Sequence, residues 1–445
     1  MYELIIIFSR FLFVFYIAYF LLQGALYILT ERGLRETPPW RAVSVQRVTI
    51  VFMHLTAFLI LAYVPREFAF DTDMLMLGAI GLGFILMGQF LADKVYKGSC
   101  PLMWNSVFFL LDTGFIMLAR LDPGLAQQQM LWFVTAFGAM LVIPFGLKFV
   151  PKFEKLEKIY LIVSLGLLIS PLLFGARTFG ALRWVRIGES FQFQPSELVK
   201  FLFVFYLASV FRKKLTFKQL VFPTAAAVVL VMILVAATDL GSALIFFLTY
   251  MMIMYISTGS AALFALGIIG ASGGAVIAYH FFSHVQVRVA AWQNPWVNMD
   301  SGGFQIVRSL FAIGTWGILG SGLTRGLPGS VPVVESDFIF AAITEEFGSF
   351  FGIGLIGVFI LLFYRGVHIA LRCDRRYYSL LAAGFTSMLA FQTFIIIGGV
   401  TKFIPLTGIT LPFVSYGGTS IVVSMLMIGI LQWVYIYNSK AENGG

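Results

Sequence analysis

The sequence predicts an all-α polytopic membrane protein, and three observations lead to that prediction. Hydrophobic residues make up 60% of the 445 residues and charged residues only 11%, far below the roughly 25% of a soluble domain. Long apolar segments recur from one end of the chain to the other. Segments of this length close their backbone hydrogen bonds internally, as helices rather than barrel strands. The lipid bilayer is therefore the main medium around the protein.

Thirteen apolar segments are expected to be spanning helices. Their centres lie near residues 17, 56, 83, 112, 139, 166, 204, 228, 248, 271, 361, 388 and 427. The first, at about 4–29, is too long for the apolar region of a signal peptide and lacks a small-residue cleavage site, so we expect it to remain as a helix. Cys100 and Cys373 fall at predicted cytoplasmic helix ends, which disfavours a structural disulfide.

Basic residues indicate the orientation of the predicted helices. They gather in the loops after the first, third, fifth, seventh and eleventh helices, which all lie on one side if the helices alternate. These residues are Arg32, Arg35, Arg41, Arg47, Lys94, Lys97, Lys148, Lys152, Lys155, Lys158, Arg212, Lys213, Lys214, Lys218, Arg365, Arg372, Arg375 and Arg376. That side should be the cytoplasm, with the N-terminus outside and the C-terminus inside. The loops account for most of the net charge of +9, so no nucleic-acid partner is expected.

Two predicted outer loops depart from this charge pattern. The loop 175–200 carries Arg177, Arg183, Arg186 and Lys200, and the long loop 282–348 carries five acidic residues, more than any other predicted outer loop. Positive charge placed against the topological bias indicates an anionic ligand. The alternative is that Arg183 and Arg186 anchor at lipid headgroups, while Glu197 and Lys200 form an i,i+3 pair.

The long loop 282–348 is expected to contain two short helices. Apolar residues at 304–318 recur on one helical face, which predicts an amphipathic helix in the membrane interface or packed over the bundle. A second helix is expected to begin at Ser336–Asp337, whose side chains could cap it, and to end at Gly348. Helical spacing would place Asp337 and Glu345 on an acidic stripe facing away from the apolar side.

Three further polar segments are candidates for chemistry. Asp239, in TDLGS at 238–242, is expected to cap the ninth helix. The segment NPWVNMDSGGFQ at 294–305 holds the isolated carboxylate of Asp300. Residues 402–420 contain two prolines and three glycines, so their backbone should be non-helical near membrane depth. Such backbone is buried in protein or lines a wet cavity, and the adjacent Lys402 favours the cavity.

Motifs in these segments resemble those of the SEDS family, of the FtsW, RodA and SpoVE type. They are FQPSELVK at 193–200, DFIFAAITEEFG at 337–348 and PLTGITLPFVSYGGTS at 405–420. The resemblance runs from about 103 to 437. The last ten predicted helices match that family's ten-helix core with its large external loop. This divides the chain into a three-helix membrane extension at 1–98 and a SEDS-type core at 99–445.

The resemblance implies a peptidoglycan glycosyltransferase that polymerises lipid II on the outer face of the bacterial cytoplasmic membrane during cell division, elongation or sporulation. Undecaprenyl diphosphate would leave with inversion at the sugar, and a class B penicillin-binding transpeptidase would be the partner. The family's catalytic Asp corresponds to Asn298 here, so we expect Asp300, two residues on, to be the general base.

The predicted substrate-binding side chains are basic residues for the diphosphate and polar residues of the cavity. They are Arg183, Arg186, Lys402, Asp337, Glu345, Glu197 and Lys200. A divalent cation, Mg²⁺ or Mn²⁺, stays open, because the sequence contains no dedicated cage of ligands.

Two other functions compete with the enzyme. A flippase or transporter for a lipid-linked precursor predicts charges buried mid-helix and inverted repeats, whereas the polar residues gather at the outer side and no repeat is evident. A non-catalytic cell-wall scaffold is the other alternative, and Asn298 is the residue that supports it.

Overall fold

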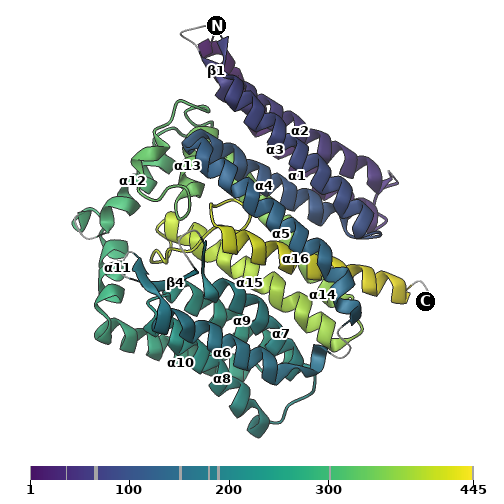
Figure 1. Ribbon diagram of the computed structural model, residues 1–445, viewed down its shortest axis with the longest axis vertical. Helices are drawn as coiled ribbons and strands as arrows, with labels where there is room; N and C mark the ends of the chain where they lie inside the picture. The colour runs from purple at the N-terminus through teal and green to yellow at the C-terminus, as the bar shows by residue number, and fades with distance from the viewer. Residues whose placement is uncertain are drawn as a thin grey trace.

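The computed structural model describes residues 2–36, 38–64, 69–149, 153–178, 181–187, 191–299 and 302–442. Helices dominate these residues (Figure 1). The helices are α1 Tyr2–Glu31, α2 Pro39–Ala62, α3 Thr72–Val95, α4 Pro101–Leu121, α5 Pro123–Phe149, α6 Glu157–Phe174, α7 Pro195–Phe211, α8 Phe217–Ala236, α9 Leu240–Thr258, α10 Ala261–Phe281, α11 Ser283–Gln293, α12 Gly303–Gly314, α13 Ile339–Phe347, α14 Ser349–Leu371, α15 Arg376–Val400 and α16 Gly418–Glu442. The strands are β1 Tyr63–Val64, β2 Ala69–Phe70, β3 Ala176–Thr178, β4 Ala181–Ile187 and β5 Phe191–Phe193.

Each of the thirteen predicted segments forms a helix, so the all-α membrane prediction is confirmed. Twelve helices in the described residues are long and apolar enough to cross a membrane. The thirteenth, α7, has 17 residues and rises about 25 Å, close to the bilayer core thickness. The sequence did not predict the two small antiparallel sheets, β1–β2 and β3–β4–β5. The second of these sheets carries Arg183.

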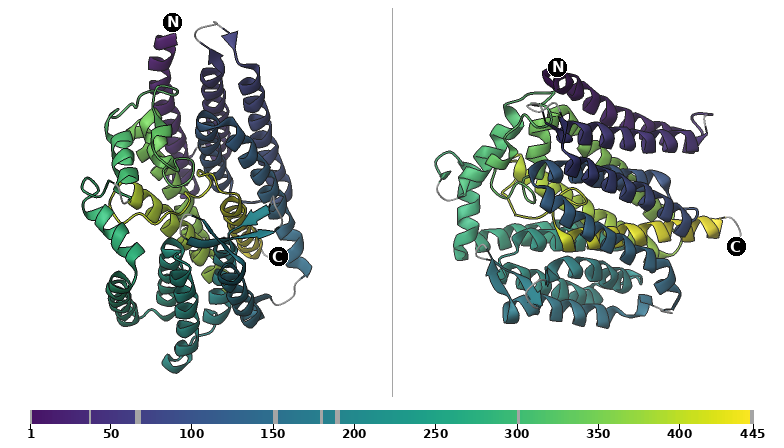
Figure 2. Two further views of the ribbon diagram at one scale, coloured as in Figure 1. Left: turned by 60° about the vertical axis from the view of Figure 1, so that its left-hand side comes forward. Right: turned by 45° about the horizontal axis from the view of Figure 1, so that its top comes forward.

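Helix burial shows which helices form the centre of the bundle. The apolar window of α4 is wholly buried, whereas the corresponding window of α6 is 17% buried and that of α10 is 0% buried. Helix α10 therefore lies at the periphery, as the two views in Figure 2 also show. Small residues allow close approach around α4: a Cβ on Gly114 would lie 2.3 Å from the carbonyl oxygen of Val414. That contact packs the centre of the bundle directly against the 401–417 loop.

The bundle has two chemically different ends. We call the end that carries residues 282–299, 302–338 and 401–417 the loop end. The opposite end, with residues 32–36, 38–47, 94–100, 212–218 and 372–376, is the basic end. In Figure 1 the loop end lies at the left with the N-terminus, and the C-terminus lies at the right. The basic loops thus gather at one end of the bundle, as the charge pattern predicts.

Helices α1, α2 and α3 pack on the core through apolar contacts and buried polar pairs. Nδ1 of His54 lies 2.5 Å from Oδ1 of Asp112 on α4, and its Nε2 lies 2.9 Å from the carbonyl oxygen of Gly78. At the basic end, the fully buried Arg365 of α14 pairs with Glu31 of α1. Charged groups inside a membrane protein are retained where such partners exist.

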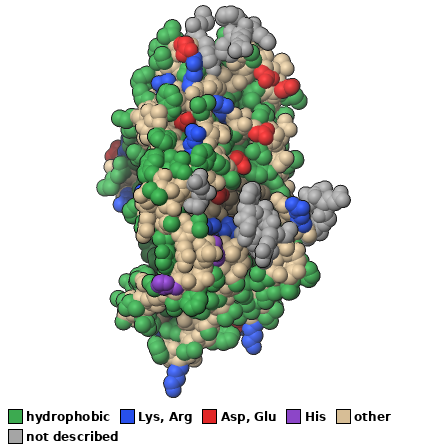
Figure 3. All heavy atoms as spheres, turned by 90° about the vertical axis from the view of Figure 1, so that its left-hand side faces the viewer, with side chains coloured by type: hydrophobic (Ala, Val, Ile, Leu, Met, Phe, Trp, Pro, Cys, Tyr) green, Lys and Arg blue, Asp and Glu red, His purple; other side chains and the backbone are tan. Residues whose placement is uncertain are grey.

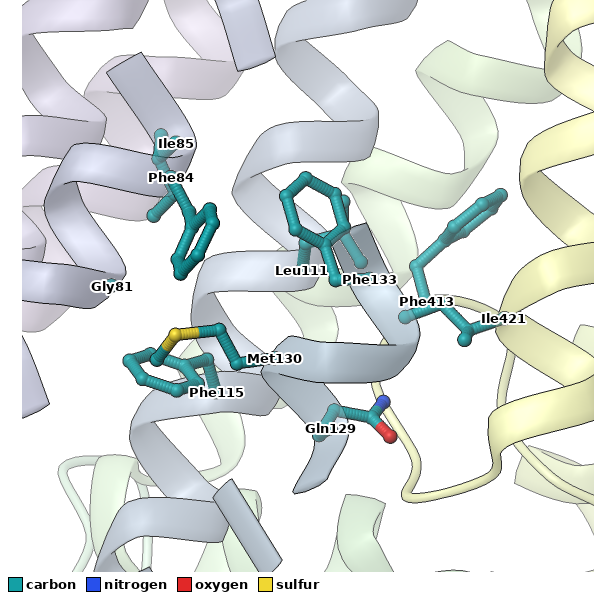
Figure 4. A pocket seen from close by; sticks show the side chains of 10 residues that line it. All are labelled: Gly81, Phe84, Ile85, Leu111, Phe115, Gln129, Met130, Phe133, Phe413 and Ile421. Carbon is teal, nitrogen blue, oxygen red and sulfur yellow. The ribbon is translucent and has the colours of Figure 1, made fainter. Parts of the chain in front are cut away.

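A small cavity lies between α3 and the core at the loop-end half of the bundle. Its volume is about 40 Å³, and its walls come from α3, α4, α5, α16 and the 401–417 loop (Figure 4). The lining is apolar apart from the side chain of Gln129; the other residues are Gly81, Phe84, Ile85, Leu111, Phe115, Met130, Phe133, Phe413 and Ile421.

Helices α11, α12 and α13 cover the loop end, and two expectations about them need correction. The amphipathic helix is present as α12, but it ends at Gly314 rather than near residue 318, and its Ser309 is buried and donates to the carbonyl oxygen of Val400 at 3.0 Å. Helix α13 begins at Ile339 after Phe338 and has no side-chain cap, so the predicted Ser336–Asp337 cap is wrong. All nine residues of α13 are buried, so its acidic groups do not face solvent.

Candidate functional site

The β3–β4–β5 sheet positions Arg183 between two segments that are distant in the sequence. Its guanidinium donates to the carbonyl oxygen of Thr238 at 2.8 Å and to that of Gly408 at 3.1 Å. Its Nε lies 3.9 Å from Oδ1 of Asp239, and the side chain is only 14% exposed. Arg183 therefore joins the start of α9 to the 401–417 loop. Anchoring at lipid headgroups does not explain these two hydrogen bonds.

Arg288 of α11 reaches the same loop from the other side. It donates to the carbonyl oxygens of Leu406 at 3.2 Å and Thr407 at 2.9 Å. Burial, together with the nearby charge of Arg183, lowers the pKa of Arg288. Two cations held this close to each other indicate a site with an affinity for negative charge.

Two carboxylates complete what we call the central cluster: Arg183, Asp239, Arg288 and Asp337. Burial alone would raise the pKa of Asp239, but the Arg183 charge and hydrogen bonds from Ser242 and Ser196 outweigh it and lower the pKa. Burial raises the pKa of Asp337 despite the opposing effects of Ser336, Arg183 and Arg288. The two acids are therefore unequal, since the pKa of Asp239 is lowered and that of Asp337 is raised.

The backbone around the central cluster is strained. Thr238 and Lys402 both have φ of 60°, a region that L residues other than Asn and Asp rarely adopt. Gly408 has φ of 67°, and a Cβ there would lie 3.2 Å from Oδ2 of Asp337. Strained backbone persists where the surrounding structure holds it, and it gathers at functional sites.

Several buried polar atoms around the cluster lack a hydrogen-bond partner among the described residues. They are Nε of Arg183, Oγ1 of Thr238, Oγ1 of Thr407 and Nε2 of His284. Buried polar groups in native proteins are normally satisfied by protein, water or ligand. In Figure 3, which faces the loop end, basic and histidine side chains gather near the middle of the surface. The arrangement suits a polar, anionic ligand.

The other predicted basic residues occupy different positions around the cluster. Arg186 is exposed on β4, opposite Gln192 of β5. Lys402 begins the 401–417 loop, and its carbonyl oxygen accepts from Nε1 of Trp292 at 3.1 Å. Both therefore belong to the loop end, with Arg186 on its surface and Lys402 on the segment that holds Arg183 and Arg288.

Glu197 and Lys200 form the predicted i,i+3 pair, but the pair is buried beneath the cluster. Nζ of Lys200 donates to Oε1 of Glu197 at 2.7 Å and to Oε1 of Gln392 at 2.9 Å. Gln392 in turn donates to the carbonyl oxygen of Thr410 at 2.8 Å. Helix α7 follows Gln194, which makes no side-chain cap bond, and the hydroxyl of Ser196 in its first turn donates to Asp239 at 3.0 Å. This chain of bonds supports the loop from inside the bundle.

Glu345 belongs to a second polar group at the carboxyl end of α13. It accepts from the backbone N–H of Leu327 at 2.8 Å, while the neighbouring Glu346 accepts from Nε of Arg120 at 3.1 Å. Burial raises the pKa of Glu345 and raises that of Glu346 to about 7. Asp337, just before the start of α13, belongs to the central cluster instead. The two acids of the predicted stripe therefore lie at opposite ends of α13.

Asp300, the predicted base, lies outside the described residues, whereas Asn298 is described. Nδ2 of Asn298 donates to the carbonyl oxygens of Ala290 at 3.1 Å and Asn294 at 2.7 Å. The backbone carbonyl oxygen of Asn298 accepts from the backbone N–H of Gly303 at 2.8 Å. The amide thus closes the turn between α11 and α12, a role that requires a donor.

Replacing Asn298 by Asp is expected to loosen this turn. A carboxylate cannot donate at neutral pH, so both bonds would be lost and negative charge would face two carbonyl oxygens, at a cost of about 1–3 kcal/mol. Hydrogen exchange of amides 290–303 should accelerate in Asn298→Asp. The exposed neighbour Gln293 offers the same amide-to-acid change as a control, and Gln293→Glu should leave exchange unchanged. Equal protection in both variants would contradict the structural role.

Sequence reasoning missed Arg288 and His284 as members of the site. Both lie on α11, which was not predicted because its apolar residues give no clear helical period. The signal that could have found them is positive charge on the outer side of the long loop, the criterion that selected Arg183. In the part of the chain that the structure describes, no group of three His, Cys, Asp or Glu side chains could hold a metal ion.

Comparisons with known proteins agree with this architecture. A family model described as "Cell cycle protein", of the FtsW/RodA/SpoVE type, matches residues 102–440. A curated relative, peptidoglycan glycosyltransferase RodA of Mycobacterium leprae, is 33% identical over 357 residues, covering 74% of this chain and 76% of the relative. Stage V sporulation protein E of Bacillus subtilis is 34% identical over 292 residues, covering 63% of this chain and 79% of that protein.

Solved structures share the fold. A chain from a structure described as "Structural coordination of polymerization and crosslinking by a peptidoglycan synthase complex" matches with a TM-score of 0.65 and 25% identity, covering 77% of this chain and 99% of that chain. The crystal structure of RodA from Thermus thermophilus has a TM-score of 0.55 at 23% identity and covers 76% of this chain and 97% of its own. On the family match and the curated relatives, this multi-pass membrane protein belongs to the FtsW/RodA/SpoVE family.

Proposed function

We propose that this protein is a peptidoglycan glycosyltransferase that polymerises lipid II at the outer face of the cytoplasmic membrane. Membership of a family whose curated relatives carry that name supports the proposal. The observation that carries it is the central cluster, where two cations, two carboxylates and unpartnered buried polar atoms meet at the loop end. A lipid-linked sugar diphosphate has the charge and the polar groups to occupy such a site.

The orientation of the chain is part of the proposal. Basic loops favour the cytoplasm, so the basic end would face inward and the loop end outward. The N-terminus and C-terminus lie at opposite ends of the bundle (Figure 1), so in this proposal the N-terminus would be outside and the C-terminus inside. The central cluster would then face the compartment in which peptidoglycan is assembled.

The proposed reaction is an inverting displacement at the first carbon of the donor sugar. The 4-hydroxyl of the acceptor attacks this carbon and gives its proton to the carboxylate of Asp300. The bond to undecaprenyl diphosphate breaks, and the departing oxygen takes the bonding electrons. Arg183, Arg288 and Lys402 would stabilise the negative charge that develops there. Arg186, exposed nearby, would contact the diphosphate as it enters or leaves.

The acidic residues have separate roles in this proposal. Asp239 keeps its charge and orients Arg183, whereas Asp337, with its raised pKa, can donate a proton in a hydrogen bond to substrate. Glu197 and Lys200 are buried beneath the loop, and Glu345 lies at the far end of α13. We therefore propose that these three support the site rather than touch the substrate.

The proposed partner is a class B penicillin-binding transpeptidase. The structural match to a chain of a peptidoglycan synthase complex that coordinates polymerisation and crosslinking supports this pairing. Glycan strands made by one protein would then be crosslinked by the other.

The direct test is polymerisation of labelled lipid II by the purified full-length protein, with and without a candidate transpeptidase. The enzyme is expected to produce a ladder of glycan strands on a gel. Movement of labelled lipid across proteoliposomes without any ladder would support the flippase instead. Absence of both activities would support the scaffold, the alternative that Asn298 favours.

A further inference from the structure

Helix α1 reaches the loop end through a charged residue in a membrane-spanning segment. Arg10 lies in the third turn of α1, within an apolar stretch where a charge is costly unless it has a partner. Its guanidinium donates to the carbonyl oxygen of Ser321. Gly322 allows this approach, because a Cβ there would lie 2.4 Å from Ile6 and 3.1 Å from Nε of Arg10. The outer half of α1 is therefore fitted to residues 319–327.

Residues 319–327, which we call the collar, wrap around the carboxyl end of α13. The N–H groups of Ser321 and Gly322 donate to the carbonyl oxygens of Glu345 at 2.8 Å and Glu346 at 2.9 Å. The side-chain carboxylates also bind the collar: Glu345 accepts from the N–H of Leu327, and Glu346 accepts from the N–H of Thr324. Helix α13 ends inside the collar with its terminal carbonyls satisfied, so any displacement of the collar displaces the helix.

Apolar contacts extend this connection to the body of α13. The ring of Phe13 meets that of Phe347 edge-on, with centroids 4.7 Å apart, and Phe347 stacks on Phe351 at 4.9 Å. Further along, Ile17 lies against Gly354 of α14, where a Cβ would be 2.8 Å away. Since all of α13 is buried, the helix is held as a rigid unit between α1 and the core.

The other end of α13 leads to the central cluster. Asp337 lies two residues before Ile339, against the turn at Gly408 and near Arg183 and Arg288. A helix of nine residues is about 14 Å long, so a shift at its collar end is transmitted to its start. The family match begins at residue 102, so α1 is an addition that the matched core does not contain.

We propose that α1 is a built-in support that positions α13, and through it Asp337, with Arg10 as the positioning residue. This inference rests on the proposed function only for its effect on activity, because the support itself is structural. Helix α3 instead packs against α2, α4 and α5, and its Phe84 and Ile85 line the small apolar cavity of Figure 4. Within the extension, α1 therefore holds the loop end, while α2 and α3 complete the bundle around α4.

The test compares Arg10→Leu, which removes the donor, with Arg10→Lys, which keeps one donor and the charge. Arg32→Gln is the matched control, because Arg32 lies at the basic end of the same helix and donates to Tyr364 at 2.8 Å. Hydrogen exchange of residues 319–327 and 339–347 should rise on the order of tenfold in Arg10→Leu and stay unchanged in Arg32→Gln. The kcat for lipid II polymerisation should fall on the order of tenfold with little change in KM, and Arg10→Lys should restore most of it.

The outcomes separate this inference from the proposed function. Normal kcat and normal collar exchange in a folded Arg10→Leu protein would overturn the inference and leave the polymerase intact. A uniform rise in exchange across the whole chain, without rescue by Arg10→Lys, would also overturn it, since the residue would then serve only overall stability. If the unmodified protein makes no polymer, the proposed function fails, and the exchange pattern still decides whether α1 supports α13.

Discussion

Replacement of Asp300 by Ala is expected to abolish glycan polymerisation, with a loss of roughly 10²–10⁴-fold in rate. The acceptor hydroxyl is a poor nucleophile until its proton is removed, and Asp300 is the carboxylate nearest in sequence to the position where the family has its catalytic Asp. Binding of lipid II should persist, because the proposed diphosphate contacts Arg183, Arg288 and Lys402 are unchanged in this variant. The measurement is the initial rate of strand formation from labelled lipid II, together with the fraction of lipid II retained by the protein.

A matched control for this experiment is Asp73→Asn, which removes an exposed carboxylate from the first turn of α3. Its rate should equal that of the unmodified protein. Full activity of Asp300→Ala would exclude this residue as the base. Recovery of activity when Asn298→Asp is added to Asp300→Ala would show that the carboxylate acts from the family's usual position.

Replacement of Arg183 by Ala should damage both the stability and the activity of the protein. Asp239 would be left buried without its cation, and the carbonyl oxygens of Thr238 and Gly408 would each lose a donor. Leaving a buried charge and two acceptors unpaired should reduce the free energy of unfolding by about 2 kcal/mol or more. Polymerisation should fall by at least roughly 10²-fold, because the leaving diphosphate loses a fixed guanidinium.

Arg186 provides the comparison for stability, because it is exposed on the same strand. Thermal unfolding in detergent should give a lower Tm for Arg183→Ala and an unchanged Tm for Arg186→Ala. Arg183→Lys should recover only part of the loss, since one ammonium group cannot reproduce the planar geometry that serves both carbonyl oxygens. An unchanged Tm in Arg183→Ala would contradict the bridging role of this residue.

The helical bundle was predictable because apolar length and loop charge are local properties of the sequence. The sheet that carries Arg183 was not predictable. Its strands are short, and the sequence pattern around them is equally typical of a polar loop. The pairing of Asp337 with the central cluster, and of Glu345 with the collar, depends on the position of α13. Helical periodicity placed these two acids on one face, but burial of the whole helix put each in a different environment.

The charge of the candidate site residues could be read from the sequence, whereas their burial could not. Positive charge against the topological bias identified Arg183 correctly as a loop-end residue. The same reasoning could not reveal that Lys200 is buried with Glu197, because an i,i+3 pair has the same spacing on a surface and in a core. Asn298 was recognised as a departure from the family, and the hydrogen bonds of its amide supply a reason for that departure.

The polar pairs between α1 or α2 and the core also govern how the helices settle against one another during assembly in the bilayer. Arg10 with Ser321, His54 with Asp112, and Glu31 with Arg365 lie at three different depths. Sliding either helix by one turn, about 5.4 Å, would leave these polar groups without partners in the hydrocarbon core of the bilayer. Leucine-rich surfaces alone would tolerate several such registers, so these three pairs select a single vertical alignment for the newly inserted chain.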